Sequence, residues 1–436
     1  MKILLLLDES WNDKKHPNNN MTNWFTDFPD AEIYTVSGGP ELPDNRCCKN
    51  YFQVSDMQML KSLYTRKRAG RVLRYEDYPT TAGDEYSKTE EFVYKRRKRF
   101  SFPLMRLARS FIWRFGRYDT EALGAFIRDF DPDVVFSQRR GTVKMCRMEK
   151  IVSSFTNAPI IAYTGDDEYS FRRASLWPSS WISILWTRSW IRRMAKKYSL
   201  YYSMSASQIE DYAKRFKVET DFLVKCGSFS EEKIHTEIGS PIRIVYAGKL
   251  YCNRWKTLKM IADALRKVNS DGVRAVLDIY TADGVTKKQM RALHDGESSV
   301  VHSAVSAEEL KRIYAESDIV LHVESFDRKN KWATKESFST KVMDCLSCGA
   351  ATMAVCWERH AAYEYLKKND IALTASSPAE VEALVCRIVD EPSIIGEYAR
   401  KAYEFGSQNH ERSVVQMKLR SDMQRVINNQ KEKIEK

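Results

Sequence analysis

The sequence has 436 residues, of which 43% are hydrophobic and 29% charged, with 17 glycines and 12 prolines. This composition excludes collagen-like, low-complexity and wholly disordered chains, and the length allows two or three domains. No run of about 18 apolar residues occurs, so we expect no membrane-spanning helix. The apolar residues 3–7 are too short for a signal peptide and are followed at once by Asp8 and Glu9, so we predict a buried first strand there.

The nine cysteines are scattered among apolar residues and form no repeating framework. This usage indicates a reducing compartment, and we expect a cytoplasmic protein. Cys345 and Cys348 form a lone CxxC, which we interpret as two small buried side chains. Because the seven histidines are dispersed along the sequence, we also expect no metal site.

The net charge of +12 comes from two segments, Lys95–Arg117 with nine basic residues and Arg172–Lys197 with seven, neither of which contains an acidic residue. Without them the chain has 54 basic and 58 acidic residues. Both segments are also rich in aromatic residues. We interpret them as amphipathic surfaces that hold the protein on the inner face of the cell membrane. The alternative is ordinary helices with buried aromatic residues, and we expect no nucleic acid partner because no recognition module accompanies the charge.

The apolar residues of the first segment recur at helical spacing, with basic residues flanking them. They are Leu104, Leu107, Ala108, Phe111, Ile112 and Phe115. In the second segment Trp177, Trp181, Trp186 and Trp190 alternate with aliphatic residues. Tryptophan is favoured at the boundary of the lipid headgroups, which supports the membrane interpretation.

Two series of apolar strands, separated by helical stretches, follow one another along the chain. We predict the first series at residues 3–7, 32–36, 133–136, 159–163, 201–204 and 221–224, and the second at residues 242–247, 275–280, 300–302, 319–323, 351–355 and 371–374. Predicted helices include residues 119–130, 207–216, 256–268, 307–316, 340–348 and 378–390. Continuous apolar strands that alternate with helices indicate parallel sheets covered on both faces.

We therefore predict an α/β protein with two doubly wound, Rossmann-like domains that face each other across a cleft. The first, residues 1–230, contains both basic segments and would face the membrane, with residues 44–91 as an irregular interruption. The second spans residues 241–405. A helical tail, residues 406–436, would pack back on the first domain.

In open parallel sheets, ligands bind beyond the carboxyl ends of the strands. This rule argues against the two D-x-D spacings in residues 129–133 as a metal–phosphate site, because they precede a strand. It favours Glu336–Ala350, where small polar residues enter a helix. Ser339, Thr340 and Lys341 lie at the start of that helix, where an anion can bind, and Asp344 follows one turn later.

A second stretch has the same character. Gly248 ends a predicted strand and lets backbone approach a ligand closely, and Lys249, Arg254 and Lys256 can neutralise a diphosphate. Solvated cations and a capped helix are the alternative explanation of each stretch taken alone. Together they point to a bound nucleoside diphosphate.

Residues 242–384 resemble the GT-B glycosyltransferases, particularly glycosyltransferase family 4. That family has a Glu-x7-Glu pattern that enters a helix ending Ala-Cys-Gly; Glu336-x7-Asp344 with Ser347-Cys348-Gly349 is similar to it. Gly248-Lys249-Leu250 and Lys256 resemble its Gly-Arg-Leu strand end and the lysine that follows. The chain differs in having Asp for the second Glu and Lys for Arg, and the first domain lacks the family's Gly-Gly loop.

The resemblance implies a GT-B fold and a role for each matched residue. Lys249 and Lys256 would bind the diphosphate, Asp344 the ribose hydroxyls and Glu336 the sugar. Residues 301–304, with His302, would hold the base. The donor would be a UDP- or GDP-linked sugar, no further cofactor is expected, and the anomeric configuration would be retained.

Retention needs no strong base, whereas inversion needs a carboxylate that deprotonates the acceptor. Asp166 and Asp167, which follow the predicted strand 159–163, are the candidates. Two adjacent acids after a strand are more often turn and capping residues.

We therefore predict a glycosyltransferase that acts on a membrane-associated glycan or glycolipid, in surface polysaccharide biosynthesis. One alternative is a sugar-nucleotide epimerase of GT-B architecture. Another is a non-catalytic membrane- or polyanion-binding protein with a degenerate nucleotide pocket. A nicotinamide-dependent dehydrogenase is disfavoured because no G-x-G-x-x-G follows the first strand.

Overall fold

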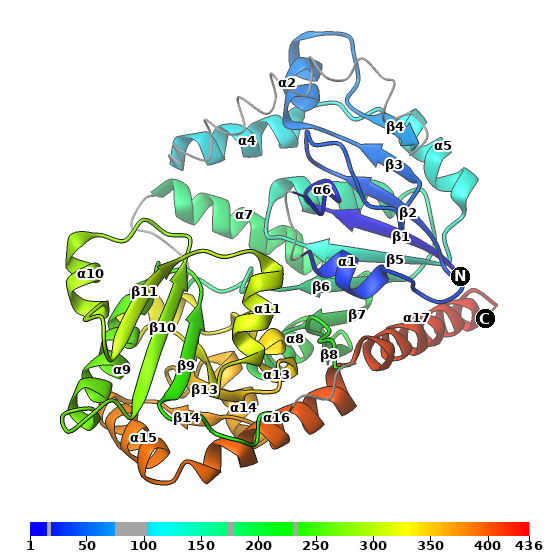
Figure 1. Cartoon of the computed structure of the whole chain (residues 1–436). Helices are drawn as coiled ribbons and strands as arrows, with labels where there is room; N and C mark the ends of the chain where they lie inside the picture. The colour runs from blue at the N-terminus through cyan, green and yellow to red at the C-terminus, as the bar shows by residue number, and fades with distance from the viewer. Residues whose placement is uncertain (15–18, 75–102, 173–177, 230–233, 436) are drawn as a thin grey trace. The chain divides into compact units, whose positions relative to one another are not determined.

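The computed structural model describes residues 1–14, 19–74, 103–172, 178–229 and 234–435. It divides into two compact units (Figure 1). The first comprises Met1–Leu223 and Gln416–Lys436, and the second comprises Val224–Val415. No helix of the described residues is long and apolar enough to cross a lipid bilayer.

The first unit is built on an eight-stranded sheet of order β4-β3-β2-β1-β5-β6-β7-β8. Neighbouring strands are parallel except β3 and β4, which are antiparallel. The strands are β1 (Lys2–Leu7), β2 (Glu32–Ser37), β3 (Asn50–Gln53), β4 (Arg71–Arg74), β5 (Val134–Arg139), β6 (Ile160–Thr164), β7 (Tyr198–Ser203) and β8 (Thr220–Phe222).

Helices connect these strands and pack on the sheet. They are α1 (Asn20–Phe25), α2 (Asp56–Tyr64), α4 (Pro103–Phe115), α5 (Thr120–Phe130), α6 (Val143–Val152), α7 (Pro178–Ala195) and α8 (Ala206–Phe216). Alternate residues of the strands face opposite layers: Leu4 and Val135 join the core that α5 and α6 cover, whereas Phe136 contacts Trp24 of α1. The continuous apolar strands of the sequence are thus buried on both faces.

The second unit has a six-stranded, wholly parallel sheet of order β11-β10-β9-β12-β13-β14. Its strands are β9 (Ile242–Ala247), β10 (Ala275–Thr281), β11 (Ser299–Ser303), β12 (Ile319–Val323), β13 (Ala351–Val355) and β14 (Leu373–Ala375). Its helices are α9 (Arg254–Val268), α10 (Lys287–Leu293), α11 (Ala307–Ala315), α12 (Arg328–Ala333), α13 (Lys341–Ser347), α14 (Ala361–Lys368), α15 (Pro378–Asp390) and α16 (Ser393–His410).

Both faces of this sheet are also covered. Ile244 packs into the core beneath α9 and α15, whereas its neighbour Val245 packs beneath α11 and α13. The prediction of two parallel, doubly wound sheets is confirmed. We call the edge of a sheet that contains the C-terminal ends of its parallel strands the carboxyl edge.

One prediction about the first unit is wrong. Residues 44–91 were expected to be irregular, yet β3, α2 and β4 lie within them and extend the sheet. These strands have four residues each, and β4 reads Arg-Val-Leu-Arg, so neither gives a long apolar run. Residues 75–91 lie outside the described part of the chain.

The last helix, α17 (Arg412–Glu435), packs on the first unit from Gln416 onward. The Gln416 amide donates to the carbonyls of Trp24 and Thr26 at 2.9 and 2.8 Å. Asp422 accepts a hydrogen bond from Tyr202, and Arg425 pairs with Glu219 at 2.7 Å. The chain thus returns to its first unit after completing the second.

Candidate nucleotide-sugar site

Lys341 joins the two stretches that the sequence singled out in the second unit. Its ammonium group donates to the carbonyl of Ala247, 94 residues away, at 2.6 Å. Gly248 lies against Lys341 Nζ and the Tyr246 hydroxyl, and a Cβ at this position would force these two side chains to move. Burial, and then the charge of Arg254, lower the pKa of Lys341. The two stretches therefore meet at the carboxyl edge of β9.

The other three cations predicted to bind the diphosphate differ in whether a carboxylate neutralises their charge. Arg254 pairs with Glu324, the buried residue directly after β12, with Nε 3.0 Å from Oε2. Lys249 and Lys256 are exposed, and each lies about 6 Å from the ring centroid of an aromatic neighbour. Arg254 thus has a built-in carboxylate partner, while the two lysines present their charge to solvent.

The start of α13 is less open to an anion than the sequence suggests. The helix has only seven residues, and the Thr340 side chain makes no capping hydrogen bond. The amide of Lys341 donates to Ser339 Oγ at 3.4 Å, and that of Val342 donates to the Ser339 carbonyl at 3.0 Å. The ammonium group of Lys341, rather than free backbone amides, is therefore the better candidate to bind an anion here.

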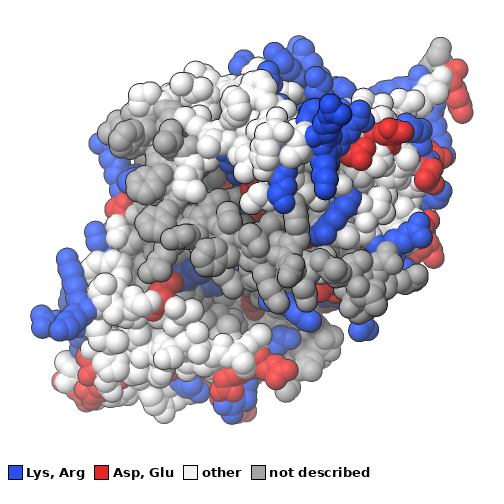
Figure 2. All heavy atoms as spheres, turned by 90° about the horizontal axis from the view of Figure 1, so that it is seen from above, with Lys and Arg blue, Asp and Glu red and all other residues white. Residues whose placement is uncertain are grey.

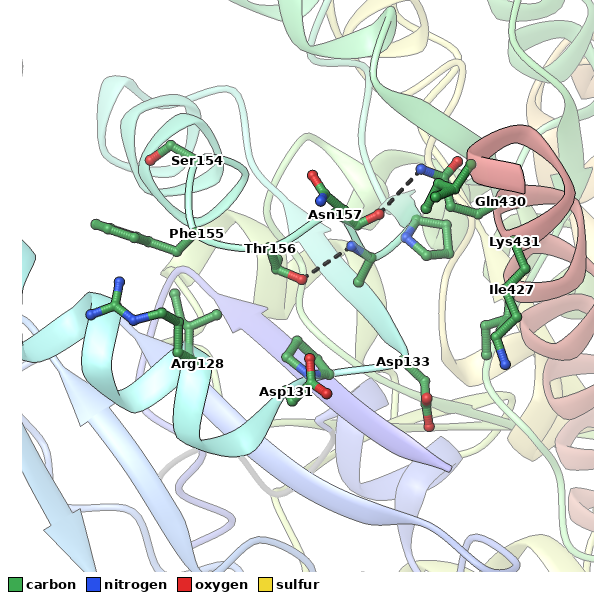
Figure 3. Close-up of a pocket in the computed structure, with 15 residues that line it drawn as sticks. Arg128, Asp131, Asp133, Ser154, Phe155, Thr156, Asn157, Ile427, Gln430 and Lys431 are labelled. Carbon is green, nitrogen blue, oxygen red and sulfur yellow. Dashed lines mark hydrogen bonds between the residues drawn. The ribbon is translucent and has the colours of Figure 1, made fainter. Parts of the chain in front are cut away.

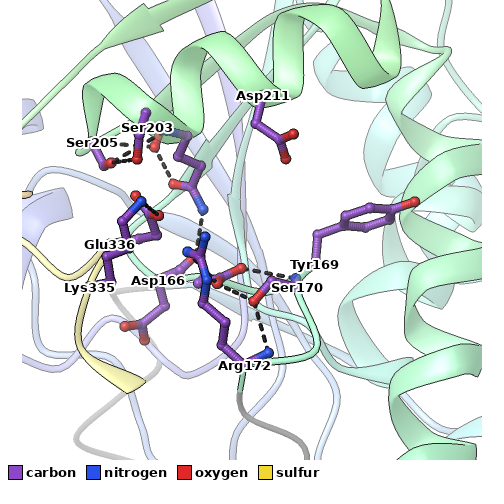
Figure 4. Close-up of polar contacts among 12 residues, drawn as sticks. Asp166, Tyr169, Ser170, Arg172, Ser203, Ser205, Asp211, Lys335 and Glu336 are labelled. Atoms are coloured by element: carbon purple, nitrogen blue, oxygen red, sulfur yellow. Dashed lines mark hydrogen bonds and ion pairs between the residues drawn. The ribbon is translucent and has the colours of Figure 1, made fainter. Parts of the chain in front are cut away.

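The two acidic residues of the Glu336-x7-Asp344 pattern have different surroundings. Glu336 is buried and pairs with Lys335 at 2.9 Å (Figure 4). Asp344 is 43% exposed and pairs with Lys225 at 2.8 Å. Lys225 precedes the predicted second domain and was not singled out from the sequence; a lone lysine after a strand gives no signal for this role.

His302, expected to help hold the base, lies on strand β11, where residues 300–302 were predicted to form a strand. Its imidazole stacks on Tyr280 of β10, with the ring centroids 4.6 Å apart. Its Nε2 lies 2.7 Å from an oxygen of Asp278. The stacked pair offers a flat aromatic surface at the carboxyl end of two adjacent strands, although Nε2 is already bonded.

In the first unit, the adjacent acids after β6 have separate roles. Asp167 is buried and binds the amide of Ser170 at 3.0 Å, and Arg172 lies 3.6 Å from it. It therefore acts as a turn residue, the alternative that the sequence left open. Asp166 is exposed, and its carboxylate points away from Ser170 and Arg172 (Figure 4).

Glu168, the next residue, belongs to a buried network that sequence reasoning missed. Arg139 lies between two carboxylates, 3.4 Å from Glu149 and 3.5 Å from Glu168. Glu149 also accepts hydrogen bonds from Ser137 and Tyr198. Burial, against the opposing charge of Arg139, raises the pKa of Glu168 to about 7.

The D-x-D residues have structural roles, as the sequence rule indicated. Asp131 ends α5 in the left-handed conformation, with φ of 51°. Asp133 accepts a hydrogen bond from the amide of Lys2 at 2.7 Å. Both line a hollow of about 480 Å³ that Ile427 and Lys431 of α17 close from one side (Figure 3). This hollow lies where β5 and β6 begin, at the opposite edge from the loops that follow them.

The two basic segments form neighbouring helices, α4 and α7, which contact each other. Arg114 of α4 lies over the rings of Trp186 and Trp190 of α7, at 5.0 and 5.8 Å. Trp190 is buried whereas Trp181 is exposed, so the tryptophans of the second segment divide between the core and the surface. Residues 95–102 and 173–177, including Trp177, lie outside the described residues.

Other side chains of the two helices are exposed, and we call them the helix-pair patch. The patch consists of Phe111 (56% exposed), Phe115 (54%), Trp181 (44%), Ile182 (58%) and Leu185 (53%). Exposed Arg192 and Arg193 lie at the end of α7, and exposed Lys196 and Lys197 lie in the turn that follows it. Figure 2 shows Lys and Arg side chains beside uncharged ones on one face of the molecule.

The expectation that the chain lacks a metal-binding cluster needs correction. His322, Cys356 and His360 are dispersed in sequence, but β12 and the turn after β13 bring them together. Their potential ligand atoms all lie within 4.8 Å of one another. Distance along the chain is a poor guide here because adjacent parallel strands come from distant segments.

Comparison with known proteins agrees with this architecture. Residues 249–415 match the family model described as glycosyl transferase-like. The structure of HepE from Anabaena in complex with UDP is similar, with a TM-score of 0.60, 11% identity, and coverage of 97% of this chain and 100% of that one. The chain has the GT-B fold. Residues 249–415, in its second unit, are similar to the glycosyl transferase-like family, as the resemblance predicted.

Two further structures show the same fold. One is described as trehalose-6-phosphate from E. coli bound with UDP-2-fluoro glucose, with a TM-score of 0.58, 10% identity, and coverage of 97% of this chain and 99% of that chain. The other, from a GtfA/B complex, has a TM-score of 0.52 and 15% identity, with 72% of this chain covered. This chain spans 61% of the length of that protein. No curated protein matches the sequence.

Proposed function

We propose that this GT-B protein transfers a sugar from a UDP- or GDP-linked donor to a membrane-associated glycan or glycolipid, in the synthesis of a surface polysaccharide. One observation carries the donor assignment: Lys341 places its ammonium group beside Gly248 at the carboxyl edge of β9. The family match over residues 249–415 supports sugar transfer. The solved structures with UDP or a UDP-sugar support a uridine donor.

In this reaction the bond between the anomeric carbon and the diphosphate oxygen breaks, and a bond to the acceptor oxygen forms. Negative charge grows on the leaving diphosphate, and fixed cations stabilise it most when they lie where it develops. Lys341, Lys249 and Lys256 supply such cations around the end of β9, whereas Arg254 is already paired with Glu324. We propose that these ammonium groups stabilise the leaving group without a metal ion.

We further propose that the anomeric configuration is retained, by the resemblance of Glu336-x7-Asp344 to the family pattern. The acceptor proton then passes to an oxygen of the leaving diphosphate, and no protein base is needed. If the configuration is instead inverted, Asp166 is the better placed of the two predicted bases, because Asp167 is engaged in its turn.

Nucleotide-sugar binding tests the donor assignment. We expect one UDP- or GDP-sugar to raise the melting temperature of the whole chain and to be hydrolysed slowly. Lys341→Ala should weaken binding of the nucleoside diphosphate by about tenfold or more, since a hydrogen bond to a charged group contributes about 1.5–3 kcal/mol. Lys368→Ala, an exposed lysine on α14, is the matched control. Equal affinity of Lys341→Ala and the wild type would contradict the proposal.

The same assay separates the alternatives. An epimerase would convert the sugar nucleotide without any acceptor, and product analysis by NMR would reveal the changed stereocentre. A non-catalytic protein would bind the nucleoside diphosphate with neither hydrolysis nor transfer.

The helix-pair patch supports the membrane part of the proposal. Aromatic and aliphatic side chains next to exposed cations suit the interface of an anionic leaflet, where each cation contributes about 1 kcal/mol. We propose that α4 and α7 hold the protein on the inner face of the cell membrane and present a lipid-linked acceptor.

Liposome co-sedimentation tests this part separately. The triple variant Phe111→Ser, Phe115→Ser, Leu185→Ser should lose binding to vesicles that contain phosphatidylglycerol. The control Met417→Ser, Ile434→Ser removes two apolar side chains that are 64% and 65% exposed on α17, and it should bind like the wild type. Equal binding of the triple variant and the wild type would refute the assignment, whereas donor binding should be unchanged in both variants.

A further inference from the structure

Three side chains that can bind a metal meet near the carboxyl edge of the second sheet. His322 lies in β12, Cys356 directly follows β13, and His360 is the residue before α14. They are 4%, 0% and 1% exposed, and their potential ligand atoms all lie within 4.8 Å of one another. None of the three belongs to the donor-binding residues described above.

The histidines are buried without the hydrogen bonds that such groups normally have. His322 Nε2 and both ring nitrogens of His360 have no partner among the described residues. Buried polar atoms in native proteins are nearly always bonded, so these nitrogens call for an explanation. A neutral imidazole ring has one nitrogen with a lone pair available for a metal.

We propose that His322, Cys356 and His360 bind one zinc ion. Imidazole nitrogen and thiolate sulfur are the ligands that zinc prefers in structural sites. Zinc bonds of about 2.0–2.3 Å in a tetrahedron place ligand atoms about 3.5 Å apart, so small side-chain rotations would bring the three atoms into bonding distance, and a water molecule would take the fourth position. On binding, the Cys356 thiol releases its proton to solvent and the thiolate balances one charge of the ion.

The surroundings give the ion a structural task. The amide of Ala361, next to His360, donates to the carbonyl of Lys335 at 2.8 Å. Lys335 in turn pairs with Glu336. An ion that fixes β12, the turn after β13 and the start of α14 therefore braces the loop that carries Glu336. Because the three ligands are buried, it takes no part in sugar transfer itself.

Metal analysis of the purified full chain tests the site. We expect about one zinc per chain by mass spectrometry, and a higher melting temperature when zinc is returned to protein treated with a chelator. Cobalt(II) in place of zinc should show the absorption band of a thiolate-to-cobalt bond. Cys356→Ser and His360→Ala should each weaken zinc binding at least tenfold in competition with a chromogenic chelator.

Two controls make the result specific. Cys345→Ser and His410→Ala replace equally buried residues of the same unit outside the cluster, and they should keep wild-type zinc affinity. Wild-type cobalt protein without a thiolate band would overturn the proposal even if the variants fail to fold. Equal zinc affinity in Cys356→Ser and the wild type would also overturn it. Neither result bears on the nucleotide site, which is tested through Lys341.

Discussion

The carboxyl edges of the two sheets differ in how many of their cations are left exposed, although Arg254 of the second unit is also paired with a buried carboxylate. In the second unit, Lys249 and Lys256 are exposed around the end of β9, and Lys341 contacts a carbonyl rather than a carboxylate. In the first unit, charges at the ends of β1 and β5 are buried in pairs. There Lys144 lies 2.9 Å from Asp8, and Arg139 lies between two carboxylates.

In the proposed function, the exposed cations serve a ligand, whereas the buried pairs serve the fold. Removing one partner of a buried ion pair costs much stability, because the partner that remains is a buried charge with neither a counter-ion nor solvent. An ammonium group that stays in solvent costs the fold little free energy, and it is available to a diphosphate. The same residue types at equivalent strand ends therefore support different roles, and burial decides which.

The largest expected effect comes from breaking the buried network. Arg139→Met leaves Glu149 and Glu168 without their cation, and the side chains of both residues are at most 5% exposed. We expect a loss of about 3–5 kcal/mol in the free energy of unfolding, measured by urea denaturation.

Arg140→Ala, at a side chain 53% exposed beside Asp8, should cost less than about 1 kcal/mol. A similar loss in both variants would mean that burial does not distinguish the two arginines.

A second expected effect concerns pH. The pKa of Glu168 is raised from 4.5 to about 7, so between these values the folded protein binds a proton that the unfolded chain has lost. Its contribution to stability is full below about pH 4.5 and is lost as pH rises through 7. We expect this contribution to reach about 3 kcal/mol.

Glu168→Gln, which cannot titrate, should flatten the fall in stability between pH 5 and 8, as followed by urea denaturation at several pH values. Asp211→Asn, at an exposed carboxylate on α8, should keep the wild-type slope. An unchanged slope in Glu168→Gln would show that this carboxyl group is ionised throughout the range.

The sequence predicted most of the fold because buried parallel strands are long apolar runs. Strand β9, which follows Pro241, and strand β12, which precedes Glu324, are examples. Such runs predicted most strands of both sheets. Strands β3 and β4, the last two at one side of the first sheet, were missed because four-residue strands with polar ends give no such signal.

The site was predicted in part for a similar reason. Gly248 and Lys341 stand out because they follow a strand or start a helix, and the structure brings them together. Partners that come from distant segments, such as Glu324 for Arg254, leave no pattern along the chain. The cluster of His322, Cys356 and His360 was missed on the same ground.

The smallest expected effect concerns an ion pair of the second unit that is neither fully buried nor fully exposed. Lys225 and Asp344 form a pair in which the carboxylate remains 43% exposed. If the pair orients Asp344 toward the ribose hydroxyls, Lys225→Ala should weaken UDP binding about two- to fivefold, equivalent to about 0.4–1 kcal/mol. The preference for UDP over its 2′-deoxy analogue should fall with it, which a merely structural pair would not change.

Isothermal titration of both nucleotides measures this preference. Lys267→Ala breaks an ion pair with Glu382 on the surface of the same unit and should leave both affinities unchanged. An intact preference in Lys225→Ala would place Asp344 among the charges that serve the fold. Burial alone would then not distinguish charges that bind a ligand from charges that stabilise the fold, because a half-exposed carboxylate can still serve only its ion-pair partner.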